Sequence, residues 1–204
     1  MSRKIMPHKY LHSTFSALTG VGLLVMAGSR LAFALMTTAG LLWVYILTAL
    51  IVFFTHPFYP KIGNKIILIS ITSLLASAFL LIVWLANPLL AIQVAYLIIL
   101  IPCYAVASPL FSSINTMKFD SAIIRTVLEA ASLGLLITAF ALIREPIGFM
   151  SLSLPGGAEG IIELFQSRDE DAFLPVRIVA MSSGAFFILA YALALFRNIK
   201  KSDA

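Results

Sequence analysis

Charged side chains inside apolar stretches are the residues of this sequence that could do chemistry. Glu129 is the acid that lies deepest in such a stretch, and Arg125 precedes it by four positions. Side chains four apart are neighbours on a helix, so the spacing favours a mutual ion pair at a membrane interface. An acid within a membrane also often marks an ion pathway, which makes Glu129, with Arg125, a candidate for cation movement. Both interpretations stay open at this point.

A second charged pair, Arg144-Glu145, stands at the end of an apolar stretch. One interpretation is that these side chains anchor the external end of a membrane span and bind carbonyl groups freed at helix ends. The other is that they contact a partner subunit. We therefore keep Arg144 and Glu145 as candidates for subunit contact.

The chain offers little for metal or covalent chemistry. Its one cysteine, Cys103, excludes an intrachain disulfide and a cysteine-based zinc site. A buried, small apolar role fits Cys103 better than metal ligation. The sequence contains no P-loop, H-E-x-x-H or G-x-S-x-G motif. We therefore expect no catalytic residue and no metal site.

The composition places these residues in a bilayer. Hydrophobic residues make up 61% of the 204 residues and charged ones 11%, with a mean hydropathy of +1.03. Soluble domains carry roughly 45–50% apolar and about 25% charged residues. A soluble enzyme, a disordered chain and a disulfide scaffold are therefore excluded. The net charge of +5 is typical of basic cytoplasmic loops and does not indicate nucleic-acid binding.

The apolar pattern predicts an all-α integral membrane protein with six transmembrane elements. A span needs about 20 mostly apolar residues. Four runs meet that requirement: Leu31–Phe54, Ile66–Ala86, Ala122–Ile143 and Leu174–Phe196. Two further runs, 14–28 and 89–110, contain several glycines or prolines, so these first and fourth elements are expected to be broken or short.

Each half of the chain has one broken element followed by two whole ones. This matching order predicts an inverted repeat of two three-helix halves, 14–86 and 87–196. Such repeats place a site at the midplane, where the two broken elements meet. Six crossings place both termini on the same side of the membrane. When the N-terminal segment (1–13) and the C-terminal tail (197–204) are cytoplasmic, ten of the fourteen Lys and Arg residues lie on the cytoplasmic side, as the positive-inside rule favours. We therefore expect a multi-pass protein of the cytoplasmic (inner) membrane, with an external loop at about 144–173 whose stretch GIIELF forms a short interfacial helix.

Three segments together resemble one family: ALIREPIGF at 141–149, SGAFFILAYALAL at 183–195 and NPLLAIQVAYLIILIP at 87–102. They are similar to the paired integral-membrane subunits of the Rnf and Nqr complexes, which are ion-pumping NADH:ferredoxin and NADH:quinone oxidoreductases. The resemblance implies a related membrane subunit of opposite orientation as partner. It also implies an iron–sulfur cluster held at the broken helices by two cysteines from each subunit, with sodium or proton movement coupled to electron transfer.

This chain departs from the family at the cluster. Our alignment puts Gly22 and Ser108 at the two ligand positions, and neither is a thiol. Cys103 lies five positions before Ser108, and the first half has no cysteine. Iron–sulfur clusters need thiolates. We therefore expect no cofactor in this chain, with iron–sulfur and flavin groups only in partner subunits.

Three functions of different classes follow as hypotheses. The first is a non-catalytic membrane subunit of an ion-translocating, NADH-dependent electron transport complex, with a scaffold or ion-path role. The alternative is the membrane component of a six-span small-solute (vitamin-type) transporter, and a purely structural protein is a third possibility. A transporter needs polar or aromatic side chains that converge on a pocket. The spans offer few of these, chiefly Trp43, Tyr45, Trp84 and Tyr96.

Overall fold

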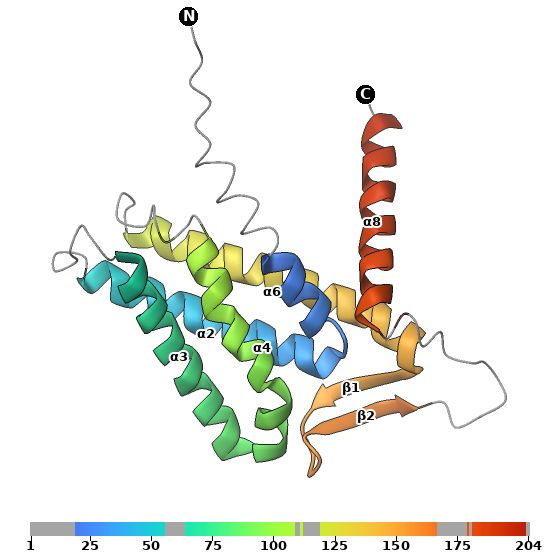
Figure 1. Ribbon diagram of the computed structural model, residues 1–204, viewed down its shortest axis with the longest axis horizontal. Helices are drawn as coiled ribbons and strands as arrows, with labels where there is room; N and C mark the ends of the chain where they lie inside the picture. The colour runs from blue at the N-terminus through green and yellow to red at the C-terminus, as the bar shows by residue number, and fades with distance from the viewer. Residues whose placement is uncertain are drawn as a thin grey trace, which may run out of the picture.

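The computed structural model describes residues 19–55, 64–108, 111, 119–166, 179 and 181–202. These residues form a helical bundle with a β-hairpin at one end (Figure 1). The elements are a helical segment at 19–27, α2 (Leu31–Thr55), α3 (Asn64–Ala86), α4 (Pro88–Ala107), α6 (Phe119–Phe149), β1 (Ser151–Pro155), β2 (Ile161–Gln166) and α8 (Ser182–Ser202).

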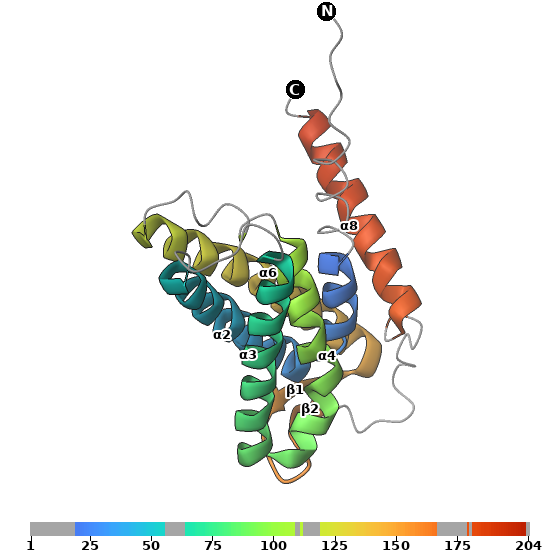
Figure 2. The same ribbon diagram turned by 60° about the vertical axis from the view of Figure 1, so that its left-hand side comes forward.

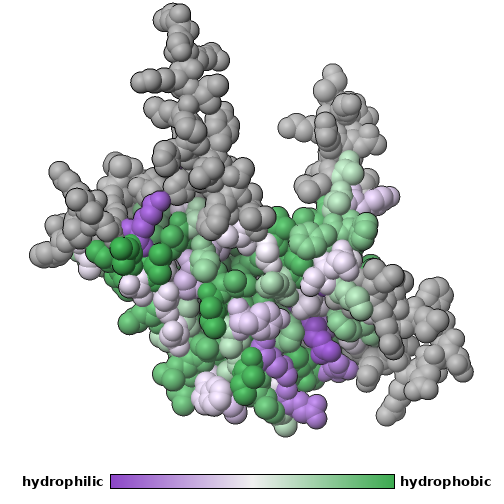
Figure 3. All heavy atoms as spheres, in the orientation of Figure 1, coloured by the Kyte–Doolittle hydropathy of each residue, from purple (hydrophilic) through white to green (hydrophobic). Residues whose placement is uncertain are grey.

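Four of these helices, α2, α3, α4 and α6, are long and apolar enough to cross a membrane. The chain is thus a mainly helical, multi-pass membrane protein, as the composition predicts. Apolar side chains cover most of the face in Figure 3, and strongly hydrophilic ones gather toward the ends of the helices. Helices α2 and α3 agree with the spans expected at Leu31–Phe54 and Ile66–Ala86. The six crossings and the inverted repeat stay predictions, since residues 14–18 and 171–178 lie outside the described residues.

The first and fourth elements differ in how they end. The first helical segment stops at residue 27, and a turn at 28–30 leads directly into α2. A Cβ atom on Gly28 would lie 2.6 Å from the Phe140 ring, so only glycine allows this turn to approach α6. The fourth element is not broken at Pro102: α4 continues through this residue and ends at its C-cap, Ser108. Membrane helices tolerate an internal proline when neighbouring helices satisfy the freed backbone groups.

Helices α2 and α6 share the most extensive contact among the described helices, and they run side by side in Figure 1. A Cβ atom on Gly134 would lie 2.3 Å from Cγ2 of Thr38, so the backbones approach at this glycine. The Thr38 hydroxyl donates to the Gly134 carbonyl at 3.2 Å. Small residues and interhelical hydroxyl contacts are typical of helix packing in membranes, where the hydrophobic effect does not draw helices together.

The connection after α6 contains a β-hairpin, so the expected interfacial helix at GIIELF is wrong. Strand β2 pairs antiparallel with β1, with Leu154 opposite Ile162. Gly156, Gly157 and Gly160 have φ values of 149°, 76° and 86°. Side chains rarely adopt such angles, whereas glycine does so at little cost, and the turn between the strands is built on them. Figures 1 and 2 show the hairpin beside the start of α2 and the turn between α3 and α4.

Candidate functional site

Arg144 binds backbone carbonyls from two distant segments. Its side chain is buried near the end of α6. Nε donates to the Val179 carbonyl at 2.9 Å, and Nη1 donates to the Val25 carbonyl at 2.8 Å. Val25 lies in the last turn of the first helical segment, whose final carbonyls have no partner within the helix. A guanidinium at this end also interacts favourably with the helix dipole.

Glu145 binds the opposite kind of helix end. Its buried Oε2 atom accepts a hydrogen bond of 2.7 Å from the N–H of Leu31, the first residue of α2. The next N–H, of Ala32, donates to Oγ of Ser153 in β1 at 3.3 Å. A carboxylate at a helix N-terminus satisfies free donors and complements the positive end of the dipole.

The two charged neighbours therefore hold both sides of the turn at 28–30. Arg144 satisfies the helix that enters this turn, and Glu145 satisfies the helix that leaves it. The anchoring interpretation predicts bonds to freed carbonyls, which Arg144 makes; the bond from Glu145 to an N–H group at a helix start was not predicted. Both side chains are buried within this chain. Their role in subunit contact stays a prediction.

Further contacts join the hairpin to the turn at 28–30 and to the turn between α3 and α4. Arg30 forms an ion pair of 3.6 Å with Glu163 of β2, and its guanidinium lies over the Phe149 ring. Asn87, the N-cap of α4, donates from Nδ2 to the Gly157 carbonyl at 2.7 Å. The turn at 28–30, the α3–α4 turn and the hairpin thus meet at one end of the bundle, which we call the hairpin end.

The second candidate site surrounds Glu129, in the part of α6 away from the hairpin end. The Ser108 hydroxyl donates to Glu129 Oε1, joining the end of α4 to α6. No ion pair joins Arg125 to Glu129 in the described part of the chain, so the expected mutual pair is wrong. Arg125 is exposed, whereas Glu129 is half-buried. Glu129 thus points toward the end of α4, whereas Arg125 lies on the outside of α6.

Tyr45 adds a group from α2 to the same site. It is fully buried, with its ring stacked on Tyr104 at 6.1 Å and 5.1 Å from the Phe111 ring. Its hydroxyl faces Ser108 and Glu129, without a hydrogen bond of ordinary geometry among the described residues. Helices α2, α4 and α6 therefore each contribute a polar group to what we call the Glu129 site: Tyr45, Ser108 and Glu129.

Sequence reasoning found these three residues but not their association. Ser108 drew attention only as a family ligand position, and Tyr45 only as one of the aromatic residues in the spans. One available signal was the pair of polar residues on the apolar helix α2, Tyr45 and Thr48, which are three apart and both buried. A shared buried face with two hydroxyl groups indicates a polar partner on a neighbouring helix.

Gly22 and Ser108, the positions that the resemblance assigns to cluster ligands, have different surroundings. Ser108 is bonded to Glu129, and the space into which a side chain at Gly22 would project is open. Cys103 is exposed, so the expected buried role is wrong. The first and fourth elements do meet, because a Cβ atom on Gly20 would lie 3.2 Å from the Tyr104 ring. Among the described residues, no group of three His, Cys, Asp or Glu side chains could hold a metal ion.

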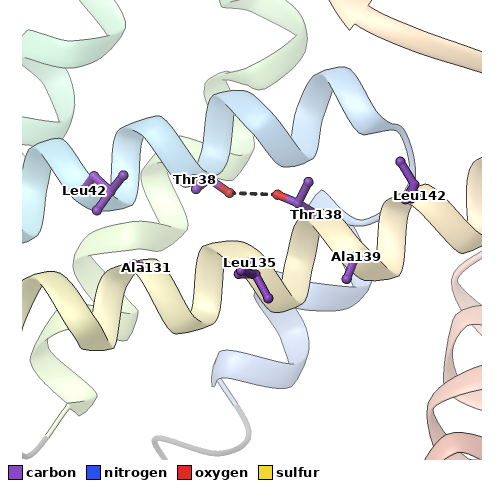
Figure 4. Close-up of a pocket in the computed structure, with 7 residues that line it drawn as sticks. All are labelled: Thr38, Leu42, Ala131, Leu135, Thr138, Ala139 and Leu142. Carbon is purple, nitrogen blue, oxygen red and sulfur yellow. Dashed lines mark hydrogen bonds between the residues drawn. The ribbon is translucent and has the colours of Figure 1, made fainter.

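An open groove of about 440 Å³ lies between α2 and α6 (Figure 4). Its polar atoms come from Thr38 and Thr138, whose hydroxyls are 3.4 Å apart. The other lining residues are apolar: Leu42, Ala131, Leu135, Ala139 and Leu142. The groove therefore has little with which to recognise a polar solute. No protein-family model and no curated protein matches the chain.

Proposed function

We propose that this chain is a membrane subunit of an Rnf/Nqr-like ion-translocating electron transport complex, with Glu129 on the ion path. The observation that carries this proposal is the Glu129 site, where an acid on an apolar membrane helix contacts Ser108 and faces the buried Tyr45 hydroxyl. Acids within membrane helices are costly and usually serve ion movement, which supports a path through this site.

The end of α4 strengthens this interpretation. Ser108 caps α4, and its N–H donates to the Tyr104 carbonyl. The C-terminal end of a helix carries partial negative charge and attracts cations. Transporters use such helix ends, together with acidic side chains, to bind sodium ions or protons near the membrane midplane. Here both features lie at one place.

Electron transfer belongs to partner subunits in this proposal. Gly22 and Ser108 have no sulfur atom, and the Ser108 hydroxyl is already bonded to Glu129. Iron–sulfur and flavin groups are therefore expected in a related membrane subunit of opposite orientation and in the other subunits of the complex. This chain supplies the scaffold and the ion path, with no catalytic residue of its own.

The contacts at the hairpin end support the proposed topology. With a cytoplasmic N-terminus, the first, third and fifth connections of six elements lie outside the cell. These connections contain Arg30, Asn87 and the hairpin, and all three are in contact in the structure. The shared location agrees with these three connections being on one side of the membrane, and the excess of Lys and Arg in the other segments is the reason to propose that both termini are cytoplasmic.

The transporter alternative has less support. It needs polar or aromatic side chains that converge on a pocket, but Trp43, Trp84 and Tyr96 are exposed on the outer faces of their helices. Tyr45 is buried, and it faces Glu129. A buried tyrosine hydroxyl that faces an acid suits an ion path better than a solute pocket, so we prefer the ion-path function.

The test uses inside-out membrane vesicles from cells that naturally make the protein. The chain is purified through a tag, co-purifying subunits are identified by mass spectrometry, and NADH-driven uptake of sodium and protons is measured. We expect a related membrane subunit to co-purify, and Glu129→Gln to abolish ion uptake without disturbing assembly. The matched control is Glu159→Gln, since Glu159 is exposed at the tip of the hairpin. Ion uptake that persists in Glu129→Gln, or a chain that purifies without a related subunit, would overturn the proposal.

A further inference from the structure

We infer that the ion handled at the Glu129 site is the proton, carried by the Glu129 carboxyl and relayed through the hydroxyls of Ser108 and Tyr45. This inference rests on the proposed function, because it names the ion for the same path. It follows from the kind of polar groups present and from how closely they approach one another.

The contact between Ser108 and Glu129 favours a proton over a metal cation. Their oxygen atoms are in direct hydrogen-bond contact, so a metal ion could bind between them only if α4 and α6 moved apart. Hard cations such as Ca²⁺ and Mg²⁺ require six or more oxygen ligands. The described groups at the site are one carboxyl and a few hydroxyls. A proton needs one acceptor atom and no additional space.

The hydroxyl groups also have the chemistry that a relay requires. A serine or tyrosine hydroxyl both donates and accepts hydrogen bonds. When the Glu129 carboxylate takes the Ser108 proton, one O–H bond forms on the carboxyl as one breaks on the serine. These transfers occur in one concerted shift, in which the serine oxygen takes the Tyr45 proton and the Tyr45 oxygen takes one from a hydronium ion at the entrance of the path. Each O–H bond that breaks is matched by one that forms, and the net change is one proton moved from the hydronium ion to the Glu129 carboxylate, which leaves a water molecule.

The surroundings of Glu129 indicate where this relay leads. Tyr45 faces the carboxyl from α2, Tyr104 and Ser108 face it from α4, and Arg125 on α6 is exposed. Thr48 lies one turn beyond Tyr45 and is buried, with no hydrogen-bond partner for its hydroxyl among the described residues. It extends the row of hydroxyls along α2, toward the end of the bundle away from the hairpin.

The test combines a spectrum that needs no turnover with a transport measurement on the purified complex. Infrared difference spectra between low and high pH report the carbonyl stretch of a protonated carboxylic acid. The chain has nine Asp and Glu residues, so we expect one component of this band to disappear in Glu129→Gln and the same component to shift in frequency in Ser108→Ala, because that change removes a hydrogen-bond donor from the carboxyl. A third variant, Tyr45→Phe, removes the tyrosine hydroxyl. Its matched control is Tyr96→Phe, since Tyr96 is half-exposed on the outer face of α4.

Transport is then measured in liposomes as NADH-driven proton and sodium uptake. Glu129→Gln should lower proton uptake by about a hundredfold or more, the usual effect of removing a proton-transfer group. Tyr45→Phe should lower it by about tenfold or more, because the change removes one of the hydroxyl groups through which the proton passes. Tyr96→Phe should change neither the band nor the uptake.

The failures of the two proposals give different results. If sodium uptake is lost in Glu129→Gln and the infrared band responds to sodium instead of pH, the ion path stands and the proton inference is overturned. If Glu129→Gln leaves both uptakes unchanged, the proposed function itself is overturned, whichever ion moves.

Discussion

The carboxyl of Glu145 and the backbone N–H of Leu31 are joined by a hydrogen bond of 2.7 Å across 114 positions of sequence. Glu145 lies near the end of α6, whereas Leu31 begins α2. With Arg144 bound to the Val25 carbonyl, this bond fixes the angle between the first helical segment and α2. The turn that makes the first element short is therefore held by residues of ALIREPIGF, one of the three segments on which the resemblance to the Rnf and Nqr subunits is based.

Replacing Glu145 should destabilise the protein in proportion to the hydrogen-bonding capacity that is lost. Glu145→Ala leaves the Leu31 N–H buried without an acceptor, at an expected cost of about 1–3 kcal/mol in the free energy of unfolding. Glu145→Gln keeps an acceptor oxygen and should cost less. Thermal unfolding in detergent measures both effects. Glu159→Ala, an exposed control, should change stability by about 0.5 kcal/mol or less. Equal losses for Ala and Gln would contradict the capping role.

Replacing Arg144 by lysine should destabilise the protein even though lysine keeps the positive charge. The guanidinium donates in two directions, to Val179 and Val25, which a lysine ammonium on a flexible stem cannot reproduce with the same geometry. Arg144→Lys and Arg144→Ala should both lower the free energy of unfolding, by about 1.5–3 kcal/mol for the loss of hydrogen bonds to a charged group. Urea titration in detergent micelles tests this expectation. A lysine variant as stable as the wild type would show that charge alone is sufficient.

The close approach of α2 and α6 predicts opposite results at two glycines. Gly134→Ala would put a methyl group 2.3 Å from Cγ2 of Thr38, so it should lower stability by about 1–3 kcal/mol. Gly22 has no atom within 4 Å of its potential Cβ position, so Gly22→Ala should be neutral or stabilising. The double variant Gly134→Ala, Thr38→Ser lacks the clashing methyl group and should recover part of the loss. Thermal unfolding of all three variants measures these effects, and no recovery would argue against this contact.

The exposed thiol leads to a prediction about the redox centre. Cys103 lies on the outer face of α4, whereas Ser108 faces Glu129. We expect Cys103→Ser to leave the iron content and visible absorbance of the purified complex unchanged, and a lipid-soluble maleimide to label the wild-type thiol. Loss of iron–sulfur absorbance in Cys103→Ser would show that this chain supplies a cluster ligand, and it would refute the assignment of all redox groups to partner subunits.

The membrane-spanning helices could be found from local sequence. The apolar runs of α2 and α3 locate both spans, because hydropathy is a property of neighbouring residues and the bilayer sets their length. Asn87-Pro88 likewise marks the start of α4, since asparagine caps a helix and proline fits its first turn. The importance of Arg144-Glu145 was also visible, as two charges at the end of an apolar run.

The partners of these residues depend on tertiary structure. The rotation of α6 about its axis directs Glu129 to Ser108 and leaves Arg125 outside, and no local spacing reports that rotation. The hairpin at 151–166 forms because its glycine turn and the packing of β1 on α2 outweigh the helical pattern of GIIELF. Leu31 meets Glu145 only when α2 and α6 pack at Gly134. Composition and periodicity describe each helix alone, whereas a site between helices depends on how their faces pack.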